Sequence, residues 1–305
     1  MPVKVIYIGG SGRSGSTLLA RIIGQIPGYV SLGEIREIWR AGLGENQACG
    51  CGADFAQCPF WRRVGDAAFG GWSNVDAAEA KAAVESFTYL DAVRRLRSGS
   101  RAAISPENRL TDLLERLYAG IAEVADGATI VDTSKGPAYA VALSSIESID
   151  LRAIHLVRDS RGVAYSWCKE VPRPYTPGRV FKMYRLGALA SARWIAHHSI
   201  MELLSRQVPV TRLRYETFTE NPQSELRRVL SDLQQNVPPS ALAFVGDSSV
   251  QLDPAHVVAG NPMRMATGAL PLQVDAAWRR DFPRLQRVQV TAMTWPMLIR
   301  YGYRP

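Results

Sequence analysis

The first residues of the chain constrain its fold most. Residues 3–8 form a run rich in β-branched and aromatic side chains, which is typical of a strand buried on both faces of a parallel sheet. The glycine-rich segment Gly9-Gly-Ser-Gly-Arg-Ser-Gly-Ser-Thr17 follows at once, and apolar residues at helical spacing then continue to a stop near Pro27-Gly28. Glycines let backbone N–H groups wrap an anion, and a helix N-terminus adds partial positive charge. This order of strand, turn and helix predicts a phosphate or sulfate cradle.

The rest of the chain alternates short apolar runs with longer amphipathic stretches. We expect further strands at residues 128–132, 151–157 and 208–214, and helices at about 74–98, 106–124, 137–145, 160–169 and 180–206. Strands that alternate with helices imply a mostly parallel sheet. The predicted fold class is α/β, a P-loop-like three-layer fold with a central, mostly parallel sheet and helices on both faces.

The length and composition favour one domain. The chain has 305 residues, 47% hydrophobic and 21% charged, without a long biased or repeated tract, so an ordinary globular core is expected. We expect a single domain over residues 1–305, with a Cys/Gly-rich excursion at about 42–71 and a helical insertion at about 74–125.

The formal net charge of +8 indicates an anionic partner. The basic residues are scattered and not interleaved with aromatics in one run, so a small polyanion is favoured over nucleic acid. The apolar N-terminal run stops at glycines, and charges interrupt the longest later apolar stretch. We therefore expect no transmembrane segment and a cytoplasmic protein, whose oligomeric state the sequence leaves open.

Three of the four cysteines lie close together, at positions 49, 51 and 58. Their spacing lacks the paired C-x-x-C of common zinc sites, and the nearest fourth ligand in sequence is Asp54. Buried or loosely packed thiols are the first expectation, a disulfide the second and a metal a distant third. No metal is therefore expected.

The glycine-rich segment nearly matches a nucleotide-binding motif. Gly10 to Thr17 would fit the Walker A pattern G-x-x-x-x-G-K-[ST], but Ser16 stands at the lysine position. Because that lysine contacts the β- and γ-phosphates, its absence disfavours an ATPase or kinase. The segment has no clean G-x-G-x-x-G for a dinucleotide, and a plain structural turn with an ordinary capping hydroxyl stays open.

The segment resembles the 5′-phosphosulfate loop of sulfotransferases that use 3′-phosphoadenosine-5′-phosphosulfate (PAPS). In that family a Lys or Arg precedes S-G-[ST]-T. The resemblance implies that the donor contacts Gly12, Arg13, Ser14, Gly15, Ser16 and Thr17.

A second resemblance concerns the donor's 3′-phosphate. The family binds it with an arginine at the end of a strand and a serine eight positions later, and Arg158 and Ser166 match that pair. An arginine at a strand's carboxyl end faces the crevice where ligands lie, whereas a surface ion pair of Arg158 with Asp159 is the plainer alternative. By the same resemblance, Tyr215 lies near the adenine and Arg264 closes over the 3′-phosphate, although Tyr215 suits a core equally well.

The catalytic assignments also come from the resemblance. Protein-tyrosine sulfotransferases use a glutamate as base, and Glu34 falls at its position, with Arg36 on a nearby family arginine that faces substrate. Lys135 resembles the lysine that contacts the bridging oxygen, beside Arg13. The alternatives are surface ion pairs, Glu34 with Arg36 or Glu37 with Arg40. The four histidines show no triad or metal pattern, and none is predicted to be catalytic.

These motifs together predict a bacterial-type sulfotransferase with protein-tyrosine-sulfotransferase-like motifs. It would move the sulfuryl group of PAPS to a hydroxyl of a small-molecule, lipid or glycan acceptor, release 3′-phosphoadenosine-5′-phosphate (PAP), and use Glu34 as general base. A P-loop kinase or nucleotide hydrolase with an atypical loop, or a non-catalytic PAPS-binding protein, are the alternatives. The acceptor pocket could involve Trp39, Trp61, Trp72 and Tyr175, which would suit a core as well.

Overall fold

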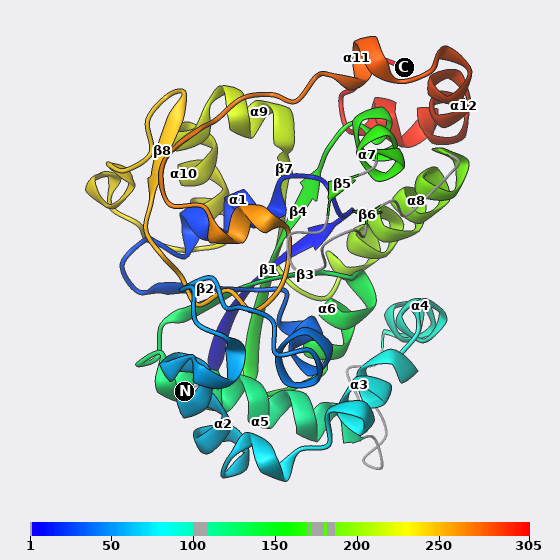
Figure 1. Ribbon diagram of the computed structural model, residues 1–305. Helices are drawn as coiled ribbons and strands as arrows, with labels where there is room; N and C mark the ends of the chain where they lie inside the picture. The colour runs from blue at the N-terminus through cyan, green and yellow to red at the C-terminus, as the bar shows by residue number, and fades with distance from the viewer. Residues whose placement is uncertain (1, 100–108, 170, 173–179, 182–186) are drawn as a thin grey trace.

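The computed structural model describes residues 2–99, 109–169, 171–172, 180–181 and 187–305. At its centre is a five-stranded sheet in the order β2-β3-β1-β4-β7, with every neighbouring pair parallel (Figure 1). The predicted α/β fold is confirmed. The strands are β1 (Val3–Gly10), β2 (Tyr29–Gly33), β3 (Thr129–Lys135), β4 (Ile149–Val157) and β7 (Val210–Arg214).

Helices cover both faces of this sheet because both faces of its central strand are apolar. Val5 and Tyr7 of β1 pack into one core, and Ile6 and Ile8 pack into another. The first core is closed by α5 (Arg109–Val124), α6 (Pro137–Leu143) and α8 (Gly187–Leu204). The second is closed by α1 (Ser16–Ile23), α9 (Tyr215–Glu220) and α10 (Pro222–Asp232).

The segment between β2 and β3 is more helical than the sequence indicated. A π-helical turn (Ile38–Gly44) precedes the cysteines, and α2 (Pro59–Phe69) lies within the stretch expected to be a loop. The helix expected at residues 74–98 is two helices, α3 (Ala77–Ser86) and α4 (Tyr89–Ser98). The break comes at Thr88, whose side chain forms a capping box with Asp91 and so starts a new helix.

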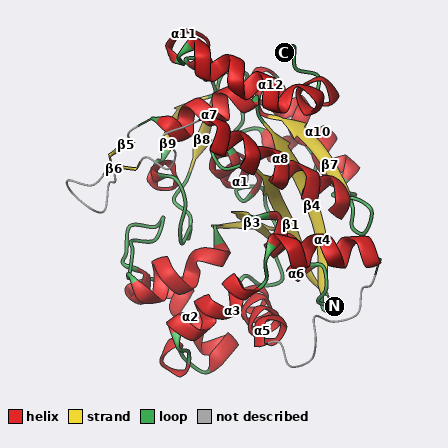
Figure 2. Ribbon diagram, turned by 90° about the vertical axis from the view of Figure 1, so that its right-hand side faces the viewer, coloured by secondary structure: helices red, strands yellow, loops and turns green. Residues whose placement is uncertain are grey.

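The last third of the chain contains a hairpin that the sequence did not indicate, β8 (Ser249–Leu252) paired antiparallel with β9 (Gly268–Pro271). It is followed by α11 (Trp278–Asp281) and α12 (Arg284–Arg300). Figure 2 shows α12 beside α7 (Ser160–Cys168) and α8, which it contacts. The helix expected from residue 180 begins at Gly187, because Val180–Phe181 form a short strand, β6, against β5 (Val171–Pro172). Residues 182–186, expected in that helix, lie outside the described residues.

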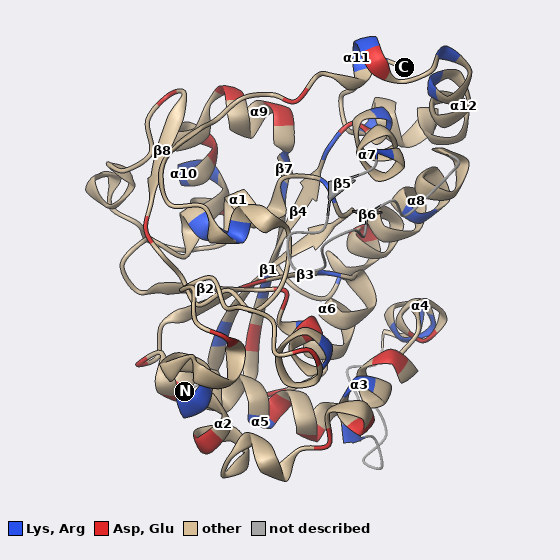
Figure 3. Ribbon diagram, in the orientation of Figure 1, with Lys and Arg blue, Asp and Glu red and all other residues tan. Residues whose placement is uncertain are grey.

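Charged residues of both signs are spread over the helices (Figure 3). Within the part of the chain that the structure describes, no helix combines the length and hydropathy that crossing a membrane requires.

Candidate functional site

The glycine-rich loop (residues 9–17) lies at the carboxyl edge of β1 and leads into α1. Gly15 has φ +84°, and a Cβ there would lie 2.7 Å from the ring of Tyr215. Gly12 approaches the ring of Trp167 on α7 as closely, since its Cβ would lie 2.6 Å from that ring. Arg13 also has a positive φ, +68°. The loop thus lies between two aromatic rings, and a Cβ at either contact would require the ring to shift.

The loop presents hydrogen-bond donors toward the crevice. Helix α1 begins without a side-chain cap and without an acidic residue in its first turn, so its first N–H groups and its positive end are available to an anion. Ser14 is fully buried, and its hydroxyl lacks a hydrogen-bond partner among the described residues. A buried hydroxyl without a partner is costly unless a ligand completes its hydrogen bonds. Ser16 and Thr17 are buried beside it.

Arg13 is half-buried, and its guanidinium lies over the ring of Trp167, 5.1 Å from the ring centre. Burial lowers the pKa of Arg13, while the negative charge of Glu34 acts in the opposite direction. Arg13 therefore lies within electrostatic reach of the predicted base.

Glu34 and Lys135 are brought together from positions 101 residues apart. Glu34 directly follows β2, Lys135 ends β3, and these strands are neighbours in the sheet. The Lys135 ammonium donates a hydrogen bond to Glu34 Oε1, and both side chains are largely buried, with 16% and 22% of their surfaces exposed. The alternative pair of Glu34 with Arg36 does not form, whereas Glu37 and Arg40 do pair, at 2.9 Å.

A buried carboxylate that the sequence did not single out supports this turn. Asp132 accepts hydrogen bonds from the backbone and hydroxyl of Ser134, at 2.7 and 2.6 Å, and from the Tyr118 hydroxyl at 2.5 Å. Burial raises the pKa of Asp132 to about 6. The Ser134 hydroxyl in turn accepts a hydrogen bond from the backbone N–H of Arg36. The network fixes the turn in which Lys135 adopts a φ of +61°.

Arg158 lies one residue beyond β4, and it is 6% exposed. Its guanidinium donates to the Arg13 carbonyl at 2.8 Å and to the backbone and carboxylate oxygens of Asp275, both at 3.0 Å. Asp159 caps α7 and pairs with Arg161 instead, so the expected alternative of an Arg158–Asp159 pair is not observed. Arg158 thus contacts the glycine-rich loop directly.

Of the other residues predicted to bind PAPS, Tyr215 lies against the glycine-rich loop, whereas Arg264 does not contact it in the interactions seen. Tyr215 is buried against Gly15, lies 4.7 Å beneath the Arg158 guanidinium, and donates its hydroxyl to the Gln273 carbonyl. Ser166 is half-buried on α7, next to Trp167. The contacts of Arg264 are elsewhere, because its guanidinium donates to the carbonyls of Ala48 and Gly260.

Arg21, which the sequence did not mark, anchors a late segment, residues 253–266, across α1. It is 3% exposed and donates to the backbone carbonyls of Asp253, Met263 and Ala266. Three carbonyls satisfy a guanidinium that would otherwise be buried without partners. No short sequence motif marks such a contact, because its partners lie more than 230 residues away.

A cavity of about 410 Å³ is lined in part by sequence neighbours of Glu34 and Lys135, although neither of these two residues lines it. Its wall includes Gly136, which follows Lys135, and Arg36, which follows Glu34 by two residues. The Tyr7 hydroxyl donates a hydrogen bond to the Gly136 carbonyl at 2.8 Å. The remaining wall is apolar and aromatic with a few charges: Val84, Glu85, Phe87, Thr88, Tyr89, Leu110, Ala138, Tyr139, Ala142 and Arg193.

The tryptophans considered for such a pocket lie elsewhere. Trp39 and Trp61 are fully buried in the core, and Trp72 packs on Phe55 with its indole N–H bonded to the Trp61 carbonyl. Tyr175 lies outside the described residues.

Three histidines near the sheet, His155, His197 and His198, are buried. Burial lowers the pKa of His155 to about 3 and that of His197 to about 4, so both are neutral at pH 7. His155 contacts His198 at 2.6 Å. His197 joins the Gly10 carbonyl to the Tyr89 hydroxyl on the cavity wall, at 3.0 and 2.8 Å.

Comparison with known proteins addresses both sequence and fold. The family model described as "Sulfotransferase family" matches residues 5–239. The sulfotransferase domain of the Synechococcus PCC 7002 olefin synthase aligns with 100% of this chain and 96% of its own, at 18% identity and a TM-score of 0.53. The sulfotransferase domain from the curacin biosynthetic pathway aligns over 100% and 99%, at 17% identity and a TM-score of 0.51. These two likenesses show the fold. No curated protein matches the sequence significantly.

Proposed function

The chain belongs to the sulfotransferase family, and on that premise we propose that it transfers the sulfuryl group of PAPS to a hydroxyl of a small-molecule, lipid or glycan acceptor. The observation that carries the proposal is the meeting of Glu34 with Lys135 within electrostatic reach of Arg13. Three residue types that sulfuryl transfer needs, a base and two cations, thus converge at one edge of the sheet. We propose further that residues 1–305 form one sulfotransferase domain.

The glycine-rich loop is the proposed site of the 5′-phosphosulfate. Support comes from the unpartnered Ser14 hydroxyl and the uncapped start of α1, which suit anionic oxygens. Arg158 is the proposed partner of the 3′-phosphate, because its guanidinium is buried beside the same loop and already binds a carboxylate. Ser166 and Tyr215 would complete this end of the donor site.

The proposed reaction is an in-line displacement, for which bound PAPS supplies the sulfuryl group and PAP as the leaving group. Glu34 accepts the proton of the acceptor hydroxyl as the new oxygen–sulfur bond forms. Lys135 and Arg13 stabilise the charge that develops on the leaving and sulfuryl oxygens as the old bond breaks. Because Lys135 binds Glu34 in this structure, a lysine that moves to the leaving oxygen releases the carboxylate for proton transfer.

The cavity beside Arg36 and Gly136 is the proposed acceptor site. Its volume of about 410 Å³ is in the range of pockets for small organic ligands. The aromatic and apolar wall suits an acceptor with an apolar body, and Arg36 and Arg193 suit a polar or anionic substituent. We propose that the acceptor hydroxyl extends from this cavity, past Arg36 and Gly136, toward Glu34.

Thermal unfolding separates this proposal from a nucleotide-triphosphate enzyme. At 100 times its Kd, a ligand adds about 2.7 kcal/mol, which for 305 residues corresponds to about 4 °C in Tm. We expect PAP to produce such a rise, and ATP with Mg²⁺ to produce little. An equal rise with ATP and Mg²⁺ would favour the kinase or hydrolase alternative.

Turnover of labelled PAPS with an acceptor panel tests the chemistry. Glu34→Gln should lower kcat by about 10²-fold or more, since general-base catalysis contributes about 10²–10⁴-fold, without weakening PAP binding, because the variant lacks the charge that competes for Lys135. Glu37→Gln is the matched control, because Glu37 pairs with Arg40 and should keep its activity. PAP binding without transfer to any acceptor, and without an effect of Glu34→Gln, would indicate a non-catalytic binding protein.

A further inference from the structure

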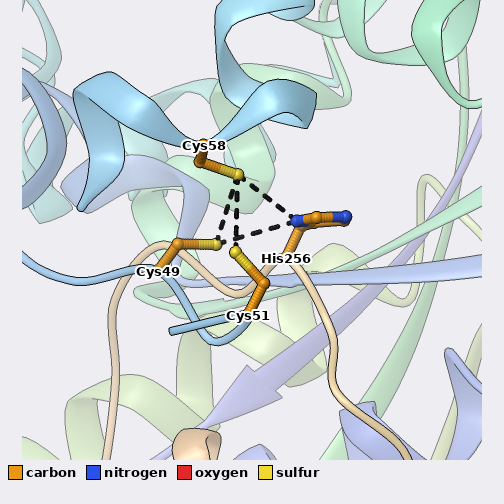
Figure 4. A group of neighbouring side chains, drawn as sticks. All are labelled: Cys49, Cys51, Cys58 and His256. Carbon is orange, nitrogen blue, oxygen red and sulfur yellow. Dashed lines mark hydrogen bonds between the residues drawn. The ribbon is translucent and has the colours of Figure 1, made fainter. Parts of the chain in front are cut away.

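The three clustered cysteines meet a histidine from far along the chain. Cys49, Cys51 and Cys58 lie on one short loop, and His256, 198 residues after Cys58, lies on the late segment. Figure 4 shows the three sulfurs and His256 Nδ1 pointing toward one common centre. All four ligand atoms lie within 4.8 Å of one another. The fourth side chain of the group is therefore His256 and not Asp54, which is exposed.

Four of the six separations between the ligand atoms are close to those of a tetrahedral zinc site. With Zn–S near 2.3 Å and Zn–N near 2.0–2.1 Å, a tetrahedron sets sulfurs about 3.8 Å apart and sulfur and nitrogen about 3.5 Å apart. The Cys58 sulfur lies 3.7 Å from those of both Cys49 and Cys51. His256 Nδ1 lies 3.3 Å from the Cys58 sulfur and 3.9 Å from the Cys49 sulfur. A disulfide would need sulfurs about 2.05 Å apart, and all four cysteines are free.

We propose that Cys49, Cys51, Cys58 and His256 bind one Zn²⁺ as a closed structural site. Three thiolates and an imidazole are a ligand set that zinc uses in such sites, and a full set of four leaves no position open for catalysis. Two features beyond the distances support the assignment. Cys49 and Cys58 are fully buried, and the His256 ring is held by stacking on Phe60 at 5.0 Å.

The zinc would join two segments that already touch at the backbone. The Gly50 N–H donates to the Val257 carbonyl at 2.9 Å, and a Cβ on Gly50 would lie 2.4 Å from the Ala255 carbonyl. Two residues after His256, the Val258 N–H donates to the Leu32 carbonyl of β2 at 3.0 Å. The late segment is thus placed against β2, the strand that Glu34 directly follows. A metal at His256 would add a direct link between the late segment and the cysteine loop to these hydrogen bonds and those of Arg21.

Metal analysis tests the site directly. The full chain, purified with reductant and without chelator, should contain one zinc per chain by mass spectrometry. After zinc removal, Co²⁺ should bind with the intense near-ultraviolet absorption of a cobalt–thiolate bond, and zinc should displace it with a Kd of nanomolar order or tighter. Cys51→Ser and His256→Gln should lower zinc content and weaken cobalt binding at least tenfold. Cys168→Ser is the matched control and should keep one zinc, because Cys168 lies on α7.

Two results would overturn the proposal. One is a folded wild-type chain with reduced thiols that takes up neither zinc nor cobalt at micromolar concentration. The other is Cys51→Ser and His256→Gln variants that retain the wild-type zinc content and cobalt spectrum. If the variants fail to fold, cobalt titration of the wild-type chain still decides. Metal content does not depend on the proposed transfer reaction, so a chain with zinc but without sulfotransferase activity would refute only the latter.

Discussion

The contact between Arg158 and Asp275 leads to a testable prediction about donor affinity. Both the carboxylate and the carbonyl of Asp275 lie 3.0 Å from one guanidinium nitrogen of Arg158. If Arg158 binds the 3′-phosphate, the phosphate must either displace this carboxylate or lie beside it. Asp275→Asn removes the competing charge and keeps the backbone contact, so we expect PAP to bind the variant more tightly.

The magnitude follows from the charges involved. A carboxylate about 5 Å from a doubly charged phosphate costs about 1.7 kcal/mol in a water-like dielectric, and the Asp275 side chain is 46% exposed, so strong screening applies. A gain of about 1–2 kcal/mol corresponds to a five- to thirtyfold lower Kd. The variant should also lose stability without donor, because Arg158 is buried and keeps only its carbonyl partners. Burial works against ionisation, but the hydrogen bond and charge of Arg158 hold the pKa of Asp275 below its ordinary value, so it is charged at pH 7.

Calorimetric titration with two ligands isolates the effect. PAP carries the 3′-phosphate, whereas adenosine 5′-monophosphate lacks it and should bind wild type and Asp275→Asn equally. Arg158→Ala should weaken PAP binding and abolish the difference between the two ligands. A Kd for PAP that rises or stays unchanged in Asp275→Asn would refute the assignment of Arg158 to the 3′-phosphate. An equal gain for both ligands would refute it too, because the gain would not depend on that phosphate.

Two further predictions concern stability. The pKa of Asp132, raised by burial to about 6, means that the folded chain binds a proton more tightly than the unfolded chain between about pH 4 and 6. The free energy of unfolding of the wild type should therefore fall, relative to that of Asp132→Asn, by about 3 kcal/mol as the pH rises across that window, and then level off. Urea unfolding of both proteins at pH 4 to 7 measures this difference. A difference that does not change with pH would show that Asp132 titrates normally. Gly15→Ala should lower stability more than Gly28→Ala. Both glycines have φ near +85°, but only a Cβ at residue 15 meets a neighbour, the Tyr215 ring. The difference should appear in Tm and in PAP affinity, and equal decreases in the two variants would mean that the ring moves aside.

The sheet could be predicted from the sequence wherever strands are buried on both faces. Strands β1, β3, β4 and β7 read as short apolar runs and lie within a few residues of their expected bounds. Strand β2 was missed because Tyr29–Gly33 is an edge strand of five residues with a serine at its centre, and so lacks a continuous apolar pattern. Helix α2 was missed because Pro59, which starts it, and Gly70, which ends it, resemble loop residues when read singly.

The site could be predicted only in part. Resemblance to family motifs singled out Arg13, Glu34, Lys135 and Arg158, whose roles stay predictions, and the structure places each at the carboxyl edge of the sheet or next to it. The groups that hold them have no local signature. Asp132 looks like any strand residue until Tyr118 is seen beside it. The contacts of Arg21 and the proposed zinc ligand set, which includes His256, join segments about 200 residues or more apart, and only the folded chain reveals them.

Two of the cations proposed to bind the donor are paired with carboxylates of the chain itself. Lys135 is bound by Glu34, and Arg158 by Asp275. A largely buried cation needs such a partner when no ligand is present, so each carboxylate stabilises the site without donor and competes with the donor for its cation. Replacement of the carboxylate by the donor would affect catalysis only at Lys135. When Lys135 moves to the leaving oxygen it releases Glu34, so the proposed base would become available only after the donor is bound. An acceptor would then not be deprotonated without a sulfuryl group to attack.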